Sequence, residues 1–282
     1  MRILVCVKPV PDPEQYGKIQ IDPETKRLMR DGIPMAINPA DKNALEEAIR
    51  IRDAFGGSIT VLSMTLPSAR DKIMESLAMG ADEAYLLSDA AFGGSDTYAT
   101  SCILAEAVKK IAEETGGSFD LILAGSSSAD GATSHVPAQL AEWLKLPHLC
   151  NVNRIEVADK ANSIGAAEGA GEGGCVVRAW KKTEDGRLLF EGSLPAVISV
   201  TRDLNKPRLV SAMGIIKARK KPLTLWSNEE LKLDPVKIGL EGSPTKSGKT
   251  FEPDLARQAE DLGSDPEEIA DKILSIMKKA GV

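Results

Sequence analysis

Residues 125–136 form the richest group of small and polar side chains that suits ligand binding. The candidate ligand residues there are Gly125, Ser126, Ser127, Ser128, Asp130, Thr133, Ser134, His135 and Val136. Small residues let the backbone approach a ligand closely, and the start of the helix expected after them favours a phosphate. The segment therefore indicates nucleotide binding, although a solvated loop ahead of a capped helix would have a similar composition.

These residues do not make up a recognisable catalytic site. His135 lies near the serines, but the sequence shows no third residue to orient it, and a GxSxG elbow is missing. The GxGxxG and GxxxxGK[ST] fingerprints of other nucleotide sites are also missing. The four cysteines form no CxxC pair, and two histidines cannot supply a histidine-rich metal site. We therefore expect neither a catalytic residue nor a metal centre.

Composition narrows the class of protein further. The 282 residues carry 41 acidic and 35 basic side chains, a net charge of −6 that disfavours nonspecific binding to nucleic acid or anionic lipid. No run reaches the roughly 18 apolar residues that a membrane span needs. The chain begins with a strand-like run rather than a signal peptide, so we expect a cytoplasmic protein.

Short apolar runs alternate with amphipathic segments over much of the chain. Strands are expected at residues 3–7, 59–64, 83–87, 120–123 and 195–201, and helices at 68–80, 97–115, 136–144 and 265–279. Another helix is expected around residues 44–51, with Asp41 as its N-cap. A small hairpin is expected within residues 18–31, where Ile19 and Ile21 alternate with polar residues.

This alternation predicts parallel strand pairing and a doubly wound, Rossmann-like α/β sheet. Strand-like pieces at 155–157, 175–177 and 188–190 suggest an antiparallel addition. We expect residues 1–216 to form a nucleotide-binding domain and residues 217–282 to form a C-terminal arm that packs on another chain.

Ligands bind such sheets beyond the carboxyl ends of the strands. Four loops leave these ends: the loop at Lys8 and Pro9, and residues 38–41, 63–65 and 125–136. A second conspicuous segment, residues 202–208, follows the last buried strand. It is either a polar connector or a docking loop whose Leu204 inserts into a partner's pocket.

Several short motifs then carry a family resemblance. They are residues 3–12, 38–39 with 43–48, 78–82 (AMGAD), 124–125 with 130–131, 139–142, 201–208 and 216–221. Each motif alone is weak, but their shared order and spacing make the set specific. Over nearly its whole length the chain resembles the beta subunit of electron-transfer flavoproteins.

The resemblance implies a heterodimer with an alpha subunit that holds an FAD. It implies AMP in this chain in the ordinary members and a second FAD in the electron-bifurcating members, where NADH is the donor. One electron then goes to ferredoxin or flavodoxin, and the other goes through the alpha-subunit FAD to an acyl-CoA dehydrogenase-type flavoenzyme. Carried onto this chain, the cofactor contacts are Cys6, Asn38, Pro39, Asp41, Met64 and the candidates within 125–136, and Leu204 is the docking residue.

Residues 10–12, 41–46 and 242–245 look more like the bifurcating branch. One departure is that Ala132 and His135 stand where family members usually carry an aspartate and a glutamine, which removes hydrogen-bonding groups from the cavity. We expect an FAD-binding, bifurcating beta subunit. The alternatives are a non-bifurcating subunit with structural AMP and a stand-alone adenine-nucleotide sensor.

Overall fold

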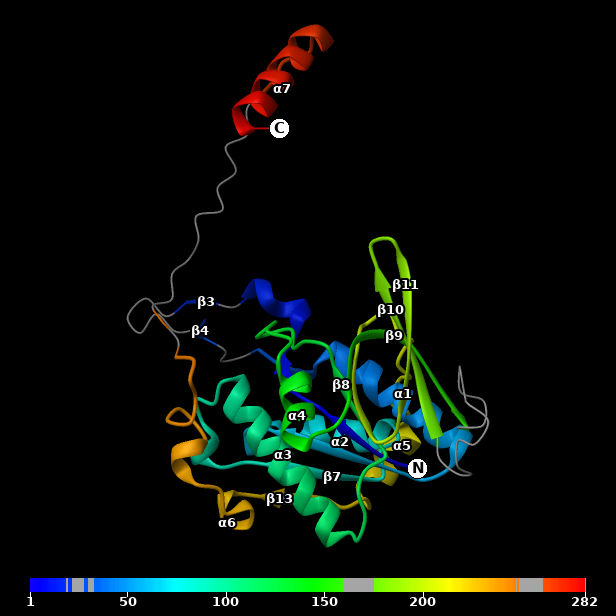
Figure 1. Ribbon diagram of the computed structural model, residues 1–282. Helices are drawn as coiled ribbons and strands as arrows, with labels where there is room; N and C mark the ends of the chain where they lie inside the picture. Colours follow the sequence, from blue (N-terminus) through cyan, green and yellow to red (C-terminus); the bar gives the residue numbers. More distant parts are fainter. Residues whose placement is uncertain are drawn as a thin grey trace.

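The computed structural model of the chain describes residues 1–18, 20–21, 28–29, 33–159, 175–246, 248 and 261–281. A nine-stranded sheet lies at its centre, in the order β11-β10-β9-β12-β8-β1-β6-β7-β13 (Figure 1). The strands are β1 (Arg2–Cys6), β2 (Pro9–Pro11), β3 (Gln20–Ile21), β4 (Leu28–Met29), β5 (Met35–Ile37), β6 (Ser58–Met64), β7 (Glu83–Leu87), β8 (Leu121–Gly125), β9 (His148–Asp159), β10 (Cys175–Thr183), β11 (Gly186–Ser193), β12 (Ala196–Val200) and β13 (Leu223–Trp226). The helices are α1 (Pro39–Phe55), α2 (Arg70–Met79), α3 (Thr97–Glu114), α4 (Val136–Leu144), α5 (Ala212–Ala218), α6 (Asn228–Leu231) and α7 (Pro266–Ala280), with short 3-10 helices at Pro13–Lys18, Pro67–Ala69, Ala90–Phe92 and Pro235–Lys237.

The main sheet is parallel from β9 to β13, and β10 and β11 extend the other edge as an antiparallel hairpin. From β1 the chain passes to β6 and β7 on one side, and α3 then returns it to β8 on the other side of β1. The strand order therefore reverses between β1 and β8. The predicted doubly wound sheet with an antiparallel addition is confirmed.

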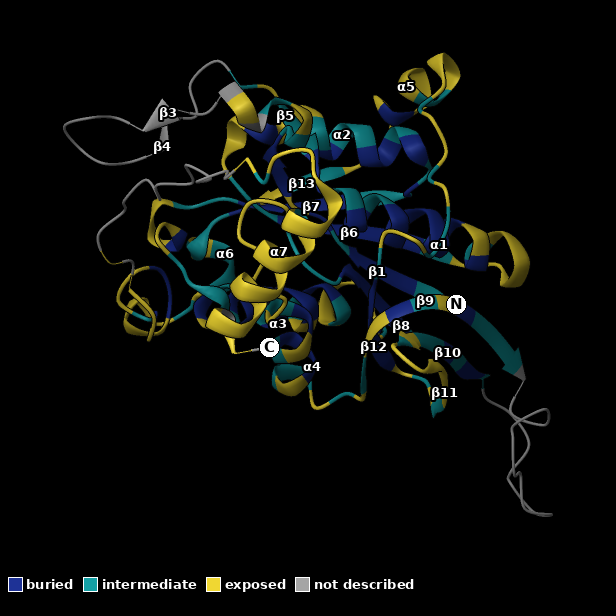
Figure 2. Cartoon of the chain, turned by 90° about the horizontal axis from the view of Figure 1, so that it is seen from above, coloured by how far each residue is buried: buried dark blue, intermediate teal, exposed yellow. Residues whose placement is uncertain are grey.

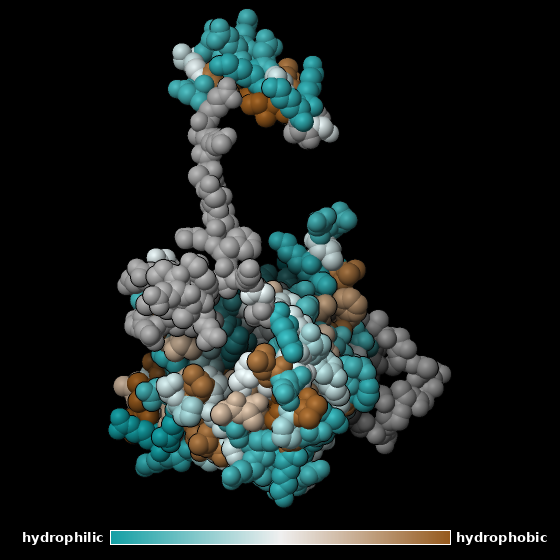
Figure 3. Space-filling model, turned by 90° about the vertical axis from the view of Figure 1, so that its left-hand side faces the viewer, coloured by the Kyte–Doolittle hydropathy of each residue, from teal (hydrophilic) through white to brown (hydrophobic). Residues whose placement is uncertain are grey.

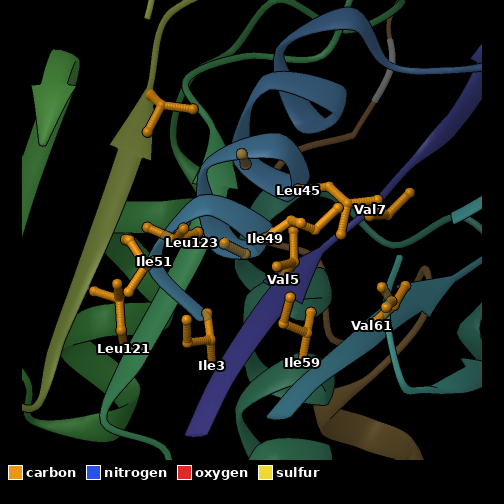
Figure 4. Close-up of a cluster of buried hydrophobic side chains, with 14 of the residues drawn as sticks. Ile3, Val5, Val7, Leu45, Ile49, Ile51, Ile59, Val61, Leu121 and Leu123 are labelled. Carbon is orange, nitrogen blue, oxygen red and sulfur yellow. The ribbon is translucent and has the colours of Figure 1, made fainter. Parts of the chain in front are cut away.

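Successive residues of the parallel strands enter two apolar cores on opposite faces of the sheet. Ile3 and Val5 of β1 pack in the core that includes α1 and α2, whereas Leu4 packs in the core that includes α3 and α4. Figure 2 shows these two pairs of helices on opposite sides of the sheet. Figure 4 shows Leu45 and Ile49 of α1 beside the strand residues of the first core. Burial on both faces explains why these strands read as continuous apolar runs.

The start of α1 differs from the sequence prediction. The helix begins at Pro39, a residue that suits the first turn, and its N-cap is Asn38. The prediction that Asp41 is the N-cap is therefore wrong. Asp41 lies within the first turn, and its carboxylate binds other elements of the fold instead.

Helix α5 and strand β13, in the C-terminal part of the chain, were not predicted. Helix α5 packs on α2, and β13 pairs in parallel with β7 at the edge of the main sheet. The small predicted hairpin is present as the pair β3 and β4, while Ile19 lies outside the described residues.

Helix α7 stands apart from the sheet and its covering helices (Figure 1). Its apolar residues Ile273, Leu274, Ile276 and Met277 are exposed, and Figure 3 shows hydrophobic side chains gathered on one side of this helix. Among the described residues, no helix has the length and apolarity needed to cross a membrane.

Candidate functional site

A cavity of about 350 Å³ lies at the carboxyl ends of β1, β6 and β8. Cys6 of β1, Met64 of β6 and Gly125 of β8 all line it. The cavity thus lies beside the point between β1 and β8 where the strand order reverses, which is where open α/β sheets bind ligands.

Most residues predicted to contact a cofactor line this one cavity. They are Cys6, Asn38, Asp41, Met64, Gly125, Ser126, Ser127, Ser128, Thr133, Ser134, His135 and Val136. The fold therefore brings loops from four separate parts of the sequence together. Pro39 and Asp130 are not among the lining residues. Pro39 is the first residue of α1, and Asp130 forms an ion pair with Lys8.

Sequence reasoning missed one wall of the cavity, the beginning of α3. Asp96, Thr97 and Thr100 line this wall. A signal was present, because a helix was predicted directly after the strand at residues 83–87, whose carboxyl end lies at the same edge of the sheet. The loop between that strand and that helix is not one of the four ligand-binding loops predicted from the sequence.

Asp41 joins three parts of the cavity through its carboxylate. It accepts hydrogen bonds from the backbone N–H groups of Lys8 at 2.7 Å and Gly125 at 3.0 Å, and from the Asn38 side chain at 3.0 Å. Burial raises the pKa of Asp41 to about 6, although these hydrogen bonds and the charge of Lys8 act in the opposite direction. The carboxylate thus holds the ends of β1 and β8 beside the start of α1.

The Asn38 side chain extends this connection to residues 127–129. Its amide donates to the carbonyl of Ser127 at 2.9 Å and accepts from the backbone N–H of Ala129 at 3.1 Å. Gly125 is required where the parts meet, because a Cβ there would lie 2.3 Å from the Asp41 carboxylate. A larger residue at position 125 would push these loops apart.

Lys8 and Asp130 form an ion pair beside the cavity. The Lys8 Nζ lies 2.7 Å from the Asp130 Oδ1. Burial would raise the pKa of Asp130, but the hydrogen bond and the charge of Lys8 hold it below its ordinary value. Because Lys8 is already paired with Asp130, backbone N–H groups would be the main further donors to an anionic ligand in the cavity.

Two helix N-termini at the cavity differ in what they can bind. The first turn of α3 is capped by Asp96, which accepts from the backbone N–H of Ala99 at 3.0 Å. The first turn of α4 has no side-chain cap from His135, and within the described chain the backbone N–H groups of Thr133 and Ser134 donate no hydrogen bond. An anion is therefore favoured at α4, where the helix dipole is not already matched by a carboxylate.

The backbone conformation just before α4 also favours an anion at the start of this helix. Ala132 and Ser134 have φ angles of +51° and +59°, a left-handed conformation that is uncommon for residues other than glycine. His135 follows in the right-handed region, with φ −89° and ψ −36°. Successive residues of opposite hand point their N–H groups into one concavity, a common form of anion site.

The remaining wall of the cavity is apolar. It includes Cys6, Leu62, Met64 and Leu104, which suit a flat aromatic ring better than a charged group. Burial, and then the negative charge of Asp41, raise the pKa of the Cys6 thiol to about 12. Cys6 is therefore a neutral contact surface and not a nucleophile.

The predicted docking loop lies away from this cavity and is fixed to α1. The Asn43 side chain donates to the carbonyls of Arg202 at 3.1 Å and Asn205 at 2.7 Å, and Arg208 Nε lies 2.8 Å from the Glu46 carboxylate.

The leucines of this region differ in exposure. Leu204 is half-buried against the core that contains α1, whereas Leu209 is 94% exposed. The role of Leu204 in docking stays a prediction.

The sheet, its reversal point and the cavity define a doubly wound α/β protein with a ligand cavity of the nucleotide-binding type. Comparison with known proteins agrees with this class. The chain matches the electron transfer flavoprotein domain over residues 25–231. It is 39% identical to the caffeyl-CoA reductase-Etf complex subunit CarD of Acetobacterium woodii, over 99% of this chain and 98% of that protein.

Two further relatives also match over almost their full length. The beta subunit of the electron transfer flavoprotein of Clostridium acetobutylicum is 37% identical, over 99% of this chain and 98% of that protein. The acryloyl-CoA reductase electron transfer subunit gamma of Anaerotignum propionicum is 36% identical, over 99% of both chains. The chain therefore belongs to the electron transfer flavoprotein beta-subunit family, whose members act in electron transfer as one subunit of a heterodimer.

Proposed function

We propose that this chain is the beta subunit of an electron-bifurcating flavoprotein and that its cavity holds FAD, with NADH as the electron donor. One electron passes to ferredoxin or flavodoxin, and the other passes through the FAD of the alpha subunit to an acyl-CoA dehydrogenase-type flavoenzyme. The observation that carries the proposal is the cavity at the reversal point, which combines an apolar wall with the uncapped start of α4. The relatives named as reductase subunits support an electron carrier over a stand-alone nucleotide sensor.

The lining residues fit an adenine nucleotide. The N–H groups at residues 133–136 would hold the phosphates, and the hydroxyls of Thr97 and Thr100 would face the sugar, since Asp96 beside them disfavours a phosphate. The apolar wall at Met64 and Leu104 would contact a ring. FAD supplies the redox chemistry when bound, while this chain binds it, orients it and excludes water.

A non-bifurcating subunit with structural AMP is the second candidate. The volume favours it to some extent, because about 350 Å³ is near the lower end of the roughly 300–1,000 Å³ of ligand pockets. In the first candidate, the cavity takes the adenylate part of FAD and the rest of the cofactor extends toward the alpha subunit. In both candidates the C-terminal arm packs on the alpha subunit, and the loop that carries Leu204 docks on the flavoenzyme.

The test is the nucleotide content of the native complex. The chain is purified from its cells with the partner subunit, the nucleotides are released by heat, and FAD and AMP are quantified per mole of this chain. Two FAD and no AMP support the bifurcating subunit. One FAD and one AMP contradict bifurcation and support the second candidate. A complex with one FAD, that of the alpha subunit, and no AMP would contradict both candidates.

A further inference from the structure

Residues 238–245 lie against the junction that leads into α3, where the orange segment of Figure 1 runs beside the start of that helix. The Ser243 hydroxyl accepts a hydrogen bond from the backbone N–H of Asp96 at 2.8 Å and donates one to the carbonyl of Gly239 at 2.6 Å. The backbone N–H of Thr245 donates to the Asp96 carboxylate at 2.9 Å. Ser243 is only 2% exposed, so its hydroxyl and the two bonds it makes are largely shielded from water.

Two glycines permit the close packing of this segment. A Cβ at Gly239, where φ is +60°, would lie 2.2 Å from the carbonyl oxygen of Ala91. A Cβ at Gly242 would lie 2.1 Å from the carbonyl carbon of Lys237. Ile238 at the beginning of the segment is buried in the core that includes α3. The segment is therefore a fixed part of the fold up to its last contact with Asp96.

The other side of the same junction forms a wall of the nucleotide cavity, through Asp96, Thr97 and Thr100. Asp96 therefore belongs both to the cavity wall and to the contact with residues 238–245. One carboxylate oxygen accepts from the backbone N–H of Ala99 and caps α3, and the other accepts from Thr245. Burial would raise the pKa of Asp96, but the hydrogen bonds from Ala99 and Thr245 hold it below its ordinary value. The ionised carboxylate thus links the cavity wall to Thr245, within the predicted C-terminal arm of residues 217–282.

We propose that Asp96 is a positioning residue that couples the nucleotide cavity to the C-terminal arm. The coupling rests on the proposed function, since it requires FAD or AMP in the cavity. A nucleotide against the first turn of α3 restrains Asp96, and Asp96 restrains Ser243 and Thr245, from which the chain continues toward α7. By linkage the effect is reciprocal, so an arm held by the partner subunit strengthens nucleotide binding by the same factor.

The test uses the full chain in complex with its partner subunit, with FAD and AMP as probes. Wild type is compared with Ser243→Ala and with Asp96→Asn. Asparagine is a good N-cap and keeps an oxygen for Ala99, but it places an NH₂ group where the N–H of Thr245 needs an acceptor. The dissociation constants of both nucleotides are measured on the nucleotide-depleted complex, and hydrogen exchange of the Thr245 amide is measured with and without nucleotide.

In wild type we expect bound nucleotide to slow exchange of the Thr245 amide by about fivefold or more. In both variants this response should be lost, and nucleotide binding should weaken by about five- to tenfold, as expected for the loss of one hydrogen bond. Ser227→Ala is the matched control, because it removes the N-cap hydroxyl of α6 in the same part of the chain without touching the cavity. It should lower thermal stability and leave the nucleotide response of Thr245 unchanged.

The outcomes separate the coupling from the proposed function. If the wild-type complex binds FAD or AMP but Thr245 does not respond, or if both variants behave like wild type, the coupling is overturned and the nucleotide site remains. If the wild-type cavity takes up neither nucleotide, the proposed function itself is overturned, and the coupling with it. If one variant fails to fold, the other decides, because each removes a different hydrogen bond between residues 243–245 and Asp96.

Discussion

Asp41 combines two properties that oppose each other at neutral pH. As a carboxylate it accepts three hydrogen bonds that connect β1, β8 and the start of α1. As a buried charge it is separated from water, which destabilises the ionised form and raises the pKa to about 6. The neighbouring Cys6 thiol stays neutral, because its own pKa is about 12.

The raised pKa of Asp41 predicts how stability depends on pH. Between about pH 4 and pH 6 the folded chain keeps a proton on Asp41 that the unfolded chain has released, because the pKa rises from 3.8 to about 6. This contribution is fully present below about pH 4 and is lost as the pH rises through 6. Its size is about 3 kcal/mol in the free energy of unfolding.

The measurement is urea unfolding of the nucleotide-free chain at several pH values between 4 and 7, for wild type and for Asp41→Asn. We expect the free energy of unfolding of wild type to fall with rising pH by up to about 3 kcal/mol more than that of the variant. Parallel pH profiles for the two proteins would contradict the assigned pKa. A wild-type stability that instead rises with pH relative to that of the variant would indicate a carboxylate whose pKa the fold lowers.

At the scale of elements, the loop of residues 201–208 and α1 act as one rigid unit. The proposed docking leucine, Leu204, packs partly on the core, whereas Leu209 just beyond the loop is 94% exposed. We therefore expect Leu204→Ala to lower the free energy of unfolding by about 1–3 kcal/mol and Leu209→Ala to change it by less than about 0.5 kcal/mol. Both changes should slow electron delivery to the partner flavoenzyme by about tenfold, since each removes apolar contact area from the docking region.

The readout is the rate of partner reduction at limiting partner concentration, together with thermal unfolding. Leu66→Ala is a suitable control, because Leu66 is 71% exposed and lies before α2 rather than in the loop. Delivery at the wild-type rate in both loop variants would argue against docking through this loop. A loss in Leu204→Ala that is fully accounted for by unfolded protein, together with slowed delivery in Leu209→Ala, would assign the docking contact to Leu209.

The elements that could be predicted most clearly from sequence are the central strands, which are buried on both faces, and the long helices. The central strands and the long helices have continuous or periodic apolar residues, so their patterns are clear. Strand β13 was missed because it is an edge strand in which only Trp226 is buried, while Leu225 is 56% exposed. Helix α5 was missed because only Ala218 of its seven residues is buried.

The candidate site, too, could be predicted from the sequence only in part. Residues 38–41 and 125–136 could be predicted as ligand-binding because they follow strands at their carboxyl ends. In an open α/β sheet, topology alone places ligands there. The hydrogen bonds between Asp41 and Gly125 and between Asn38 and Ser127 were not predictable, since each joins residues more than 80 positions apart. The cavity wall at Asp96 could not be predicted without knowing that the loop after β7 reaches the same cavity.

At the scale of the whole molecule, the chain leaves apolar surface uncovered in separate places. Leu188 and Phe190 on the edge strand β11 are 50% and 40% exposed, and Ile273 and Ile276 of α7 are 42% and 50% exposed. Uncovered apolar surface of this kind is typical of a protein that is completed by a partner. It agrees with a subunit of a heterodimer, the assembly type of this family.

Helix α7 allows a direct test of whether a partner subunit covers this apolar surface. It has 15 residues, a length at which an isolated helix is marginally stable in water, so its apolar side needs a surface to pack on. We propose that this surface belongs to the alpha subunit. The double variant Ile273→Ser with Ile276→Ser should weaken the heterodimer by about 2 kcal/mol, roughly 30-fold in Kd, because two side chains that the interface would partly bury lose their apolar contacts.

The dissociation constant is measured by titration of the alpha subunit onto the full chain, with the melting temperature of the free chain as a check on folding. Asp271→Ser with Lys278→Ser is the matched control, since it changes two residues of the same helix, leaves its charge balance unaltered and keeps the apolar side. We expect this control to bind like wild type and both double variants to melt like wild type, because the sheet is stabilised by its own two cores. A weaker heterodimer only in the apolar variant assigns α7 to the interface. An unchanged Kd would place the partner on other surfaces of the chain, of which the uncovered edge at β11 is the next to test.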